Sequence, residues 1–167
     1  MQVNNIIILT GDIQTGKTTF LYYWIKGKAN VAGILTPVKK GKRFFYDIAD
    51  DIYSDMETTG KGEAVLKVGR FVFSANAFKI ASDKLLLWSN ENKWGYIIID
   101  EIGPLELNQH KGFYNALMQL IEHLNTRQVL LLVVRTTMLN IAVDFFKQRN
   151  KAITIFDIEH PEILNSL

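Results

Sequence analysis

The segment from Gly11 to Thr18 reads GDIQTGKT and follows directly on an apolar run that begins at Ile6. It matches the full pattern G-x-x-x-x-G-K-[ST], the P-loop, which lies between a strand and a helix. Its glycines permit a turn whose backbone N–H groups point inward and continue into the positive end of the next helix. Because glycine is about 7% of residues, the pattern arises by chance in fewer than roughly one such chain in a hundred. We therefore predict phosphate binding here, with a glycine-rich turn that only caps a helix as the alternative.

The chemistry of this segment gives each side chain an expected role. Lys17 should reach the β- and γ-phosphates of a nucleotide, and the Thr18 hydroxyl should bind Mg²⁺. The residues expected to contact the nucleotide are Gly11, Asp12, Ile13, Gln14, Thr15, Gly16, Lys17, Thr18 and Thr19.

Short β-branched runs alternate with longer helical patterns along the whole chain. Strands are predicted at 6–10, 32–36, 44–49, 96–100, 129–134 and 152–156, and helices at 17–27, 78–90, 112–124 and 138–148. The middle, around TTGKGE and GRFVFSANAF, has a less clear pattern. This alternation predicts an α/β fold, a single P-loop domain over residues 1–167 with a mostly parallel central sheet and helices on both faces.

A second candidate site is the acidic pair Asp100 and Glu101, which ends the apolar strand in IIIDEIGPLEL. Ligands bind outside the carboxyl ends of parallel strands, the edge where the P-loop also lies. Asp100 is then placed to hold Mg²⁺. Glu101 points differently, because successive strand residues alternate in direction, and is the candidate general base for a water that attacks the γ-phosphorus. Two solvated acids at a strand end are the alternative.

Composition excludes several classes of site. The chain has no cysteine, and its three histidines lack metal-ligand spacing, so any metal must be held by oxygen. The net charge of +2 makes nucleic acid an unlikely partner, despite the basic cluster KKGKR at 39–43. We expect a cytoplasmic protein, because no apolar run approaches about 18 residues and the N-terminus lacks a leader pattern.

Further segments carry a resemblance to a known family. GILTP, GKRFFYDI, KVGRFVFSANAF and IIIDEIGPLEL, with its second acid Glu106, resemble segments of the small P-loop nucleoside-triphosphatase family, of the cancer-related nucleoside-triphosphatase type. The similarity extends from Ile6 to about Phe156. It implies hydrolysis of nucleoside triphosphates to diphosphates.

The chain departs from this family at several positions. After GILT the family carries Glu-Val-Arg, and this chain reads Pro37-Val38-Lys39. Lysine cannot make the bidentate contact of a guanidinium. The lysine at this position would therefore be less able to stabilise the charge of a phosphate group. The family's Gly-Phe and Phe-Glu appear as Phe45-Tyr46 and Phe78-Lys79. These changes bear on rate and base preference.

Arginines and phenylalanines supply the remaining candidates. Arg135 follows the strand at 129–134 and is a candidate sensor of the γ-phosphate or arginine finger; a surface arginine is an equal alternative. Thr136 could act similarly but more mildly, and Arg43 and Arg70 cannot be placed from the sequence. Phe71, Phe73 and Phe78 could stack on a base, but a place in the core is favoured.

We therefore predict Mg²⁺-dependent hydrolysis of ATP or GTP to diphosphate and phosphate. One alternative is a switch that binds nucleotide but scarcely hydrolyses it, suggested by the residues at 37–39. A small nucleotide or metabolite kinase is another, although the sequence reveals neither an acceptor pocket nor an arginine-bearing lid. A nucleic-acid-associated ATPase is disfavoured by the low charge.

Overall fold

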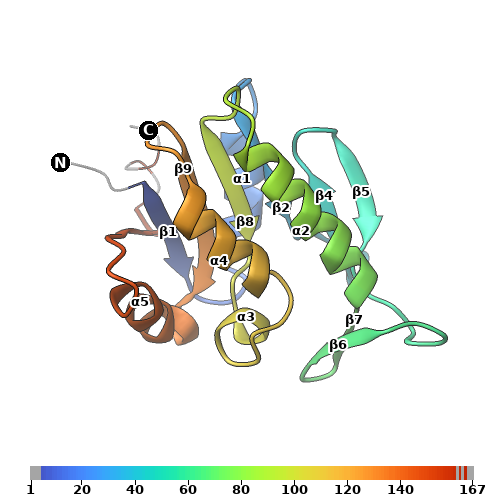
Figure 1. Ribbon diagram of the computed structural model, residues 1–167. Coiled ribbons are helices and arrows are strands. Elements are labelled where there is room, and N and C mark those ends of the chain that lie inside the picture. Colours follow the sequence, from blue (N-terminus) through green and yellow to red (C-terminus); the bar gives the residue numbers. More distant parts are fainter. Residues whose placement is uncertain (1–4, 161, 163, 165–167) are drawn as a thin grey trace.

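The fold is built on a twisted central sheet (Figure 1). The structure is a computed structural model, and it describes residues 5–160, 162 and 164. The strands are β1 (Ile6–Gly11), β2 (Val31–Leu35), β3 (Val38–Lys39), β4 (Lys42–Asp47), β5 (Ile52–Asp55), β6 (Val65–Val68), β7 (Phe71–Ser74), β8 (Tyr96–Asp100), β9 (Val129–Arg135) and β10 (Thr154–Asp157). The helices are α1 (Lys17–Trp24), α2 (Ala75–Ser89), α3 (Pro104–Leu107), α4 (Tyr114–His123) and α5 (Leu139–Lys147), with a 3₁₀ turn η1 (Thr136–Met138).

The sheet is mostly parallel, as the alternating pattern predicts. Its strands follow the order β10-β1-β9-β8-β2-β4-β3, and β5 pairs with the free side of β4. The pairs from β10 to β2 are parallel, whereas β4 runs antiparallel to β2, β3 and β5. In the register of the parallel pairs, Gly11 of β1 is the partner of Arg135 of β9, and Asp100 of β8 is the partner of Val133 of β9. The P-loop, Asp100 and Arg135 therefore meet at one edge of the sheet.

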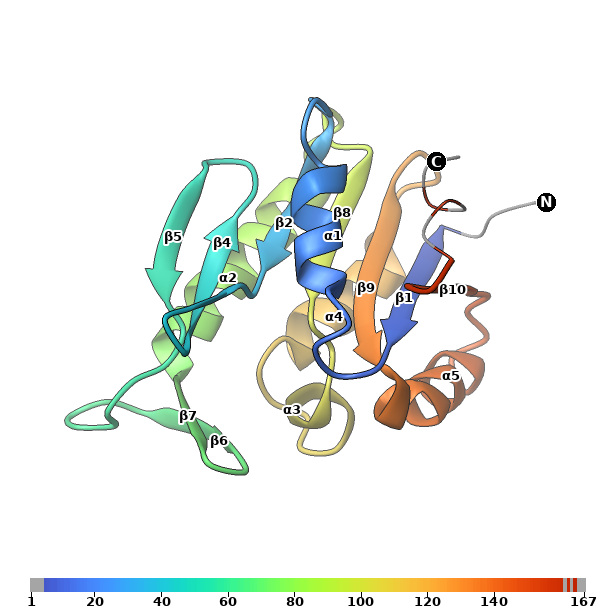
Figure 2. The same cartoon turned by 180° about the vertical axis from the view of Figure 1, so that it is seen from behind.

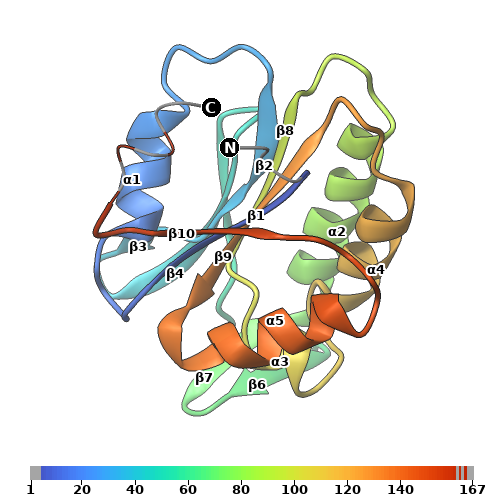
Figure 3. The same cartoon turned by 90° about the vertical axis from the view of Figure 1, so that its left-hand side faces the viewer.

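Helices cover both faces, because successive strand residues point to opposite sides. Ile7 and Leu9 of β1 pack with Leu21 and Trp24 of α1 in one buried cluster. Ile6 and Ile8 belong to the other cluster, which includes buried residues of α2, α4 and α5. Figure 3 shows α1 alone on one side of the sheet and α2 and α4 on the other. The predicted α/β architecture is confirmed.

The structure adds β3, β5 and the hairpin of β6 and β7, which the sequence did not predict. Figure 2 shows β5 beside β4, the strand expected at 44–49, with the separate hairpin of β6 and β7 below them. The helix expected from residue 78 begins at Ala75, because the Ser74 hydroxyl accepts a hydrogen bond from the Ala77 N–H at 3.2 Å and caps its first turn. The helix expected to reach residue 27 ends at Trp24, before Gly27 with its φ of 80°.

The helices in the described part of the chain are all too short or too polar to cross a membrane. The predicted domain of 1–167 includes residues 1–4, 161, 163 and 165–167, which lie outside the described ones. That full extent stays a prediction.

Candidate active site

The P-loop joins the end of β1 to the start of α1, as predicted. Gly16 caps this helix with a φ of 83°, a left-handed conformation that glycine adopts without strain. It has no side chain to bond the first N–H groups of α1, and the first turn contains no acidic residue. The positive end of the helix is therefore unopposed by its own sequence and suits an anion.

Lys17 is held over this loop by oxygen atoms of the loop itself. Its ammonium donates to the carbonyls of Gly11, at 2.8 Å, and Asp12, and to the Thr15 hydroxyl at 3.3 Å. Only 7% of the residue is exposed. Burial lowers the pKa of Lys17, and the nearby carboxylates of Glu101 and Asp100 oppose this effect. A phosphate oxygen would replace one of the loop contacts, because an ammonium has three donors.

Thr18 and Asp100, the two predicted Mg²⁺ ligands, lie in direct contact. The Thr18 hydroxyl donates to Oδ2 of Asp100 at 2.6 Å, and the same oxygen accepts the Thr36 N–H at 3.1 Å. Asp100 is 2% exposed, and this burial raises its pKa to about 6 even though both hydrogen bonds act to lower it.

These oxygen donors fit Mg²⁺, which prefers hard oxygen ligands. Among the described residues, no group of three or more acidic or histidine side chains could hold a metal ion. A magnesium site here therefore depends on substrate phosphates and water for its other ligands, the usual arrangement for Mg²⁺ in proteins that bind triphosphates.

Glu101 and Arg135 form an ion pair across the ends of β8 and β9. The sequence indicated Glu101 as a candidate general base and Arg135 as a candidate sensor of the γ-phosphate, but it did not predict that the two side chains are in contact. Both side chains are 25% exposed. The Nε atom of Arg135 is buried and has no hydrogen-bond partner in the described part of the chain. The guanidinium thus binds Glu101 and retains donor capacity.

A cavity of about 630 Å³ connects these groups. Of the predicted site residues it is lined by Ile13, Gln14, Thr15, Gly16, Lys17, Thr18, Thr19, Asp100, Glu101 and Arg135. Gly11 and Asp12 do not line it; their carbonyls hold Lys17 instead. The lining residues that the sequence did not indicate are Tyr22, Tyr23, Leu35, Thr36 and Tyr53.

The residues at 37–39, where the chain departs from the family pattern, also line this cavity. Lys39 extends over Tyr53, with its Nζ atom 3.2 Å from the ring centroid. The Tyr53 ring in turn lies against Tyr46, at a centroid distance of 4.7 Å. Lys39 is thus a cation at the wall of the cavity, held by an aromatic face.

The aromatic and basic candidates fall largely where the sequence favoured. Phe73 and Phe78 are buried in the core, and Phe71 is half-buried on the hairpin. The cluster KKGKR spans the turn between β3 and β4: Lys40 and Gly41 are exposed and have positive φ angles, whereas Lys42 and Arg43 are half-buried in β4. Thr136 begins η1 and does not line the cavity.

Glu106, in the short helix α3 that follows β8, has a structural role next to the site. Its two carboxyl oxygens accept the N–H groups of Gly103, at 3.0 Å, and Phe113, at 2.9 Å. Gly112 has a φ of 61°, and a Cβ there would lie 2.3 Å from Oε1 of Glu106. The residue is 3% exposed, and burial raises the pKa of its carboxyl group from 4.5 to about 7. Glu106 therefore ties the loop after β8 to the start of α4.

This raised pKa predicts a pH dependence of stability. Between pH 4.5 and about 7 the folded protein keeps a proton that the unfolded chain has lost, so the free energy of unfolding should fall as pH rises and level off above about 7. The fall amounts to roughly 3 kcal/mol. Denaturant unfolding of the parent and Glu106→Gln measures this dependence. Between pH 6 and 7, above the pKa of about 6 of Asp100, the free energy of unfolding should change less with pH in the variant than in the parent. The same change with pH in both proteins would contradict the raised pKa of Glu106.

The comparisons with known proteins give the family. A family model described as NTPase matches residues 6–165. The chain belongs to the NTPase family. The chain is 30% identical over 140 residues to the nucleoside-triphosphatase THEP1 of Saccharolobus solfataricus. The aligned region covers 78% of this chain and 76% of that protein. The resemblance seen in the sequence is confirmed, and this NTPase is by family a hydrolase.

Two solved structures share the fold of this NTPase. The crystal structure of THEP1 from the hyperthermophile Aquifex aeolicus has a TM-score of 0.68 and 18% identity, over 95% of this chain and 94% of that one. The solution structure of a human cancer-related nucleoside triphosphatase has a TM-score of 0.68 and 19% identity, over 96% and 95%.

Proposed function

We propose that this NTPase hydrolyses nucleoside triphosphates such as ATP and GTP to diphosphate and phosphate in an Mg²⁺-dependent reaction. The observation that carries the proposal is the 2.6 Å contact between the Thr18 hydroxyl and Asp100, beside Lys17 and Glu101 in one cavity. A P-loop hydroxyl and a strand-end aspartate are the protein ligands that P-loop enzymes use for Mg²⁺.

Each residue then has a stated task. The amides at the start of α1 and the Lys17 ammonium bind the β- and γ-phosphates. Thr18 and Asp100 would hold Mg²⁺, which when bound would supply positive charge to the phosphate oxygens. Glu101 accepts a proton from, or orients, the attacking water.

Arg135 has a task that depends on its contact with Glu101. The ion pair fixes the Glu101 carboxylate at the wall of the cavity. The remaining guanidinium donors can face a γ-phosphate oxygen, and an arginine in that place stabilises charge in the transition state. A cytoplasmic location and the absence of a nucleic-acid partner stay predictions from the sequence.

Phosphate release from ATP, GTP, CTP and UTP, each with Mg²⁺ and with excess EDTA, tests the proposed function. We expect release from more than one base, because a P-loop binds phosphates, and loss of release in EDTA. Tight binding of Mg²⁺-triphosphate without phosphate release would favour the switch that the residues at 37–39 suggest.

Lys39→Arg restores the residue type that the family carries and should leave turnover unchanged or raise it. A guanidinium keeps the contact with the Tyr53 face and offers two parallel donors to a phosphate oxygen. The kcat and KM of the variant and the parent decide the point. A marked fall in kcat would show that the position requires a lysine.

A further inference from the structure

A second cavity, of about 220 Å³, adjoins the nucleotide cavity, and the proposed hydrolysis assigns no ligand to it. The two cavities share the lining residues Thr36, Arg43, Glu101 and Arg135. Glu101, the proposed base, therefore faces both of them. A molecule in the second cavity would approach the γ-phosphate from the side of Glu101.

The inner wall of this cavity is aromatic and closely packed. Phe73, Phe78 and Phe113 are buried, and the rings of Phe78 and Phe113 lie 4.9 Å apart. The Phe71 ring is parallel to the Phe73 ring at 6.0 Å. Met56, Val68 and Leu105 complete the apolar lining. An apolar pocket with a few placed polar groups is typical of a small-molecule site, and this volume suits one aromatic ring.

The wall of the cavity carries unbalanced positive charge. The guanidinium groups of Arg43 and Arg70 lie 4.8 Å and 5.1 Å from the centroid of Phe71. Within the described residues, neither arginine forms an ion pair with a carboxylate. The two acids that line the cavity are already engaged, Glu101 by Arg135 and Glu106 by backbone N–H groups. An anionic ligand would complement this charge.

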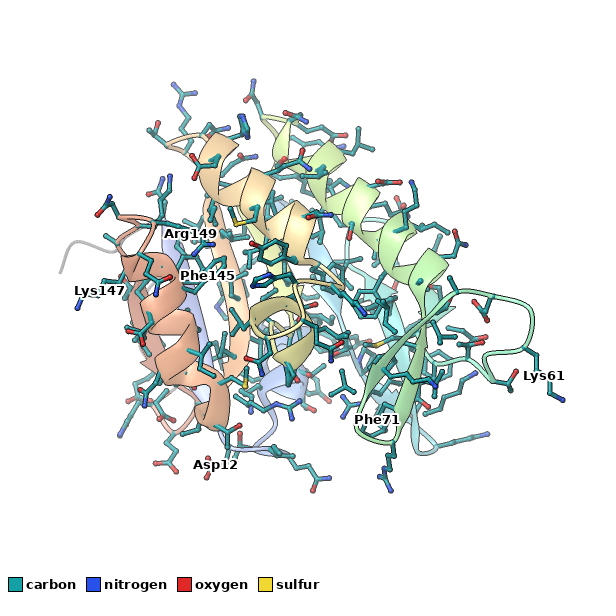
Figure 4. The ribbon with its side chains drawn as sticks, turned by 60° about the horizontal axis from the view of Figure 1, so that its bottom comes forward. Asp12, Lys61, Phe71, Phe145, Lys147 and Arg149 are labelled. Atoms are coloured by element: carbon teal, nitrogen blue, oxygen red, sulfur yellow. The ribbon has the colours of Figure 1, made fainter. Side chains whose placement is uncertain are left out.

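Arg70 comes from the turn of the β6–β7 hairpin, between the paired residues Val68 and Phe71. Figure 4 shows Phe71 of this hairpin at the same edge of the molecule as Asp12 of the P-loop. The structure thus contains both features that the sequence did not reveal for a kinase, a pocket beside the base and an arginine on a projecting hairpin.

We propose that the second cavity binds a small aromatic alcohol that carries a carboxylate or phosphate group, and that its hydroxyl accepts the γ-phosphoryl group of the triphosphate. The hydroxyl oxygen bonds to the γ-phosphorus while the bond from that phosphorus to the β–γ bridging oxygen breaks. The electron pair of that bond leaves with the diphosphate, and the hydroxyl proton passes to Glu101. The transfer rests on the proposed function of the P-loop site; ligand binding does not.

Three matched compounds separate binding from transfer. 4-(Hydroxymethyl)benzoate has the ring, the anion and the hydroxyl; 4-methylbenzoate lacks the hydroxyl; benzyl alcohol lacks the anion. Titrated by NMR against the full chain without nucleotide, both benzoates should bind, and benzyl alcohol roughly tenfold more weakly. With Mg²⁺-ATP added, only 4-(hydroxymethyl)benzoate should yield a phosphoester in ³¹P spectra.

Variants of the hairpin place the ligand. Arg70→Ala should weaken benzoate binding by roughly tenfold, whereas Lys67→Ala, which removes an exposed cation of the same hairpin outside the cavity, should not. Val68→Phe should fill the cavity and abolish both binding and transfer. If Val68→Phe does not fold, the Arg70 and Lys67 pair still decides the site.

Failure of this inference differs from failure of the proposed function. Absence of benzoate binding, or equal binding by the parent and Arg70→Ala, would overturn the second site. Binding without phosphoester, while ATP is still converted to ADP, would overturn its role as an acceptor site. If no ADP forms from ATP under any condition, the proposed function itself fails, and the titration without nucleotide still tests the ligand.

Discussion

Glu101→Gln should bind Mg²⁺-triphosphate about as tightly as the parent protein and hydrolyse it roughly 10²- to 10⁴-fold more slowly, the usual worth of general-base catalysis. Glutamine keeps the size of the side chain and an oxygen that can accept from Arg135. It removes the charge and basicity that a proton transfer needs. Calorimetry measures binding, and phosphate release at saturating nucleotide measures turnover. A variant that hydrolyses at the parental rate would exclude Glu101 as the base and favour the switch.

Asp100→Asn is the companion to this experiment, because the adjacent acid has a different proposed role. Both hydrogen bonds to Asp100 reach one oxygen, Oδ2, so an asparagine oxygen can keep the contacts with Thr18 and Thr36. The lost charge should weaken the hold on Mg²⁺. Part of the hydrolysis rate that Asp100→Asn loses should therefore be recovered at a higher Mg²⁺ concentration. The rate that Glu101→Gln loses should not be recovered in this way.

Lys17→Ala should abolish useful affinity for nucleoside triphosphates. The ammonium is the buried cation of the P-loop, and its removal leaves the β- and γ-phosphates without that neutralising partner. It also removes the contacts that join Lys17 to the carbonyls of Gly11 and Asp12. A calorimetric titration with Mg²⁺-ATP measures the loss.

Lys147→Ala is the matched control for this substitution. It removes an exposed lysine at the end of α5, outside the nucleotide cavity, and should bind ATP like the parent. Thermal unfolding of both variants shows whether they fold. A folded Lys17→Ala protein with undiminished affinity would show that the P-loop is not the binding site.

The central strands and the P-loop were predictable because local sequence determines them. The strand at Tyr96–Asp100 has the predicted bounds, since strands buried on both faces read as unbroken apolar runs. Asp100 was placed near Thr18 from topology alone, because the carboxyl ends of parallel strands share one edge.

The hairpin of β6 and β7 was not predicted. Its strands have four residues each and are mostly half-buried, with Phe73 as the buried exception, so they lack a long apolar pattern. Its two-residue turn is Gly69-Arg70, with a φ of 55° at Gly69, and not one of the stronger Asn-Gly or Asp-Gly signals. The second cavity was missed for the same reason, since the hairpin supplies part of its wall.

Side-chain pairing at the site was also beyond the sequence. Arg135 and Glu101 are separated by 34 positions, and only the parallel pairing of β8 with β9 brings them together. Glu106 looked like one more acid of the motif, yet its carboxyl group is buried against backbone N–H groups. Such contacts depend on the tertiary fold, which gives no local signal in composition or spacing.

Hydrolysis of Mg²⁺-ATP in water enriched in ¹⁸O tests the central claim most directly, because it reports which phosphorus the water attacks. Mass spectrometry of the products should find one ¹⁸O atom in the released phosphate, none in ADP, and no products when EDTA removes Mg²⁺. Label in ADP, release of pyrophosphate, or turnover that EDTA does not reduce would contradict an Mg²⁺-dependent attack on the γ-phosphorus at this site.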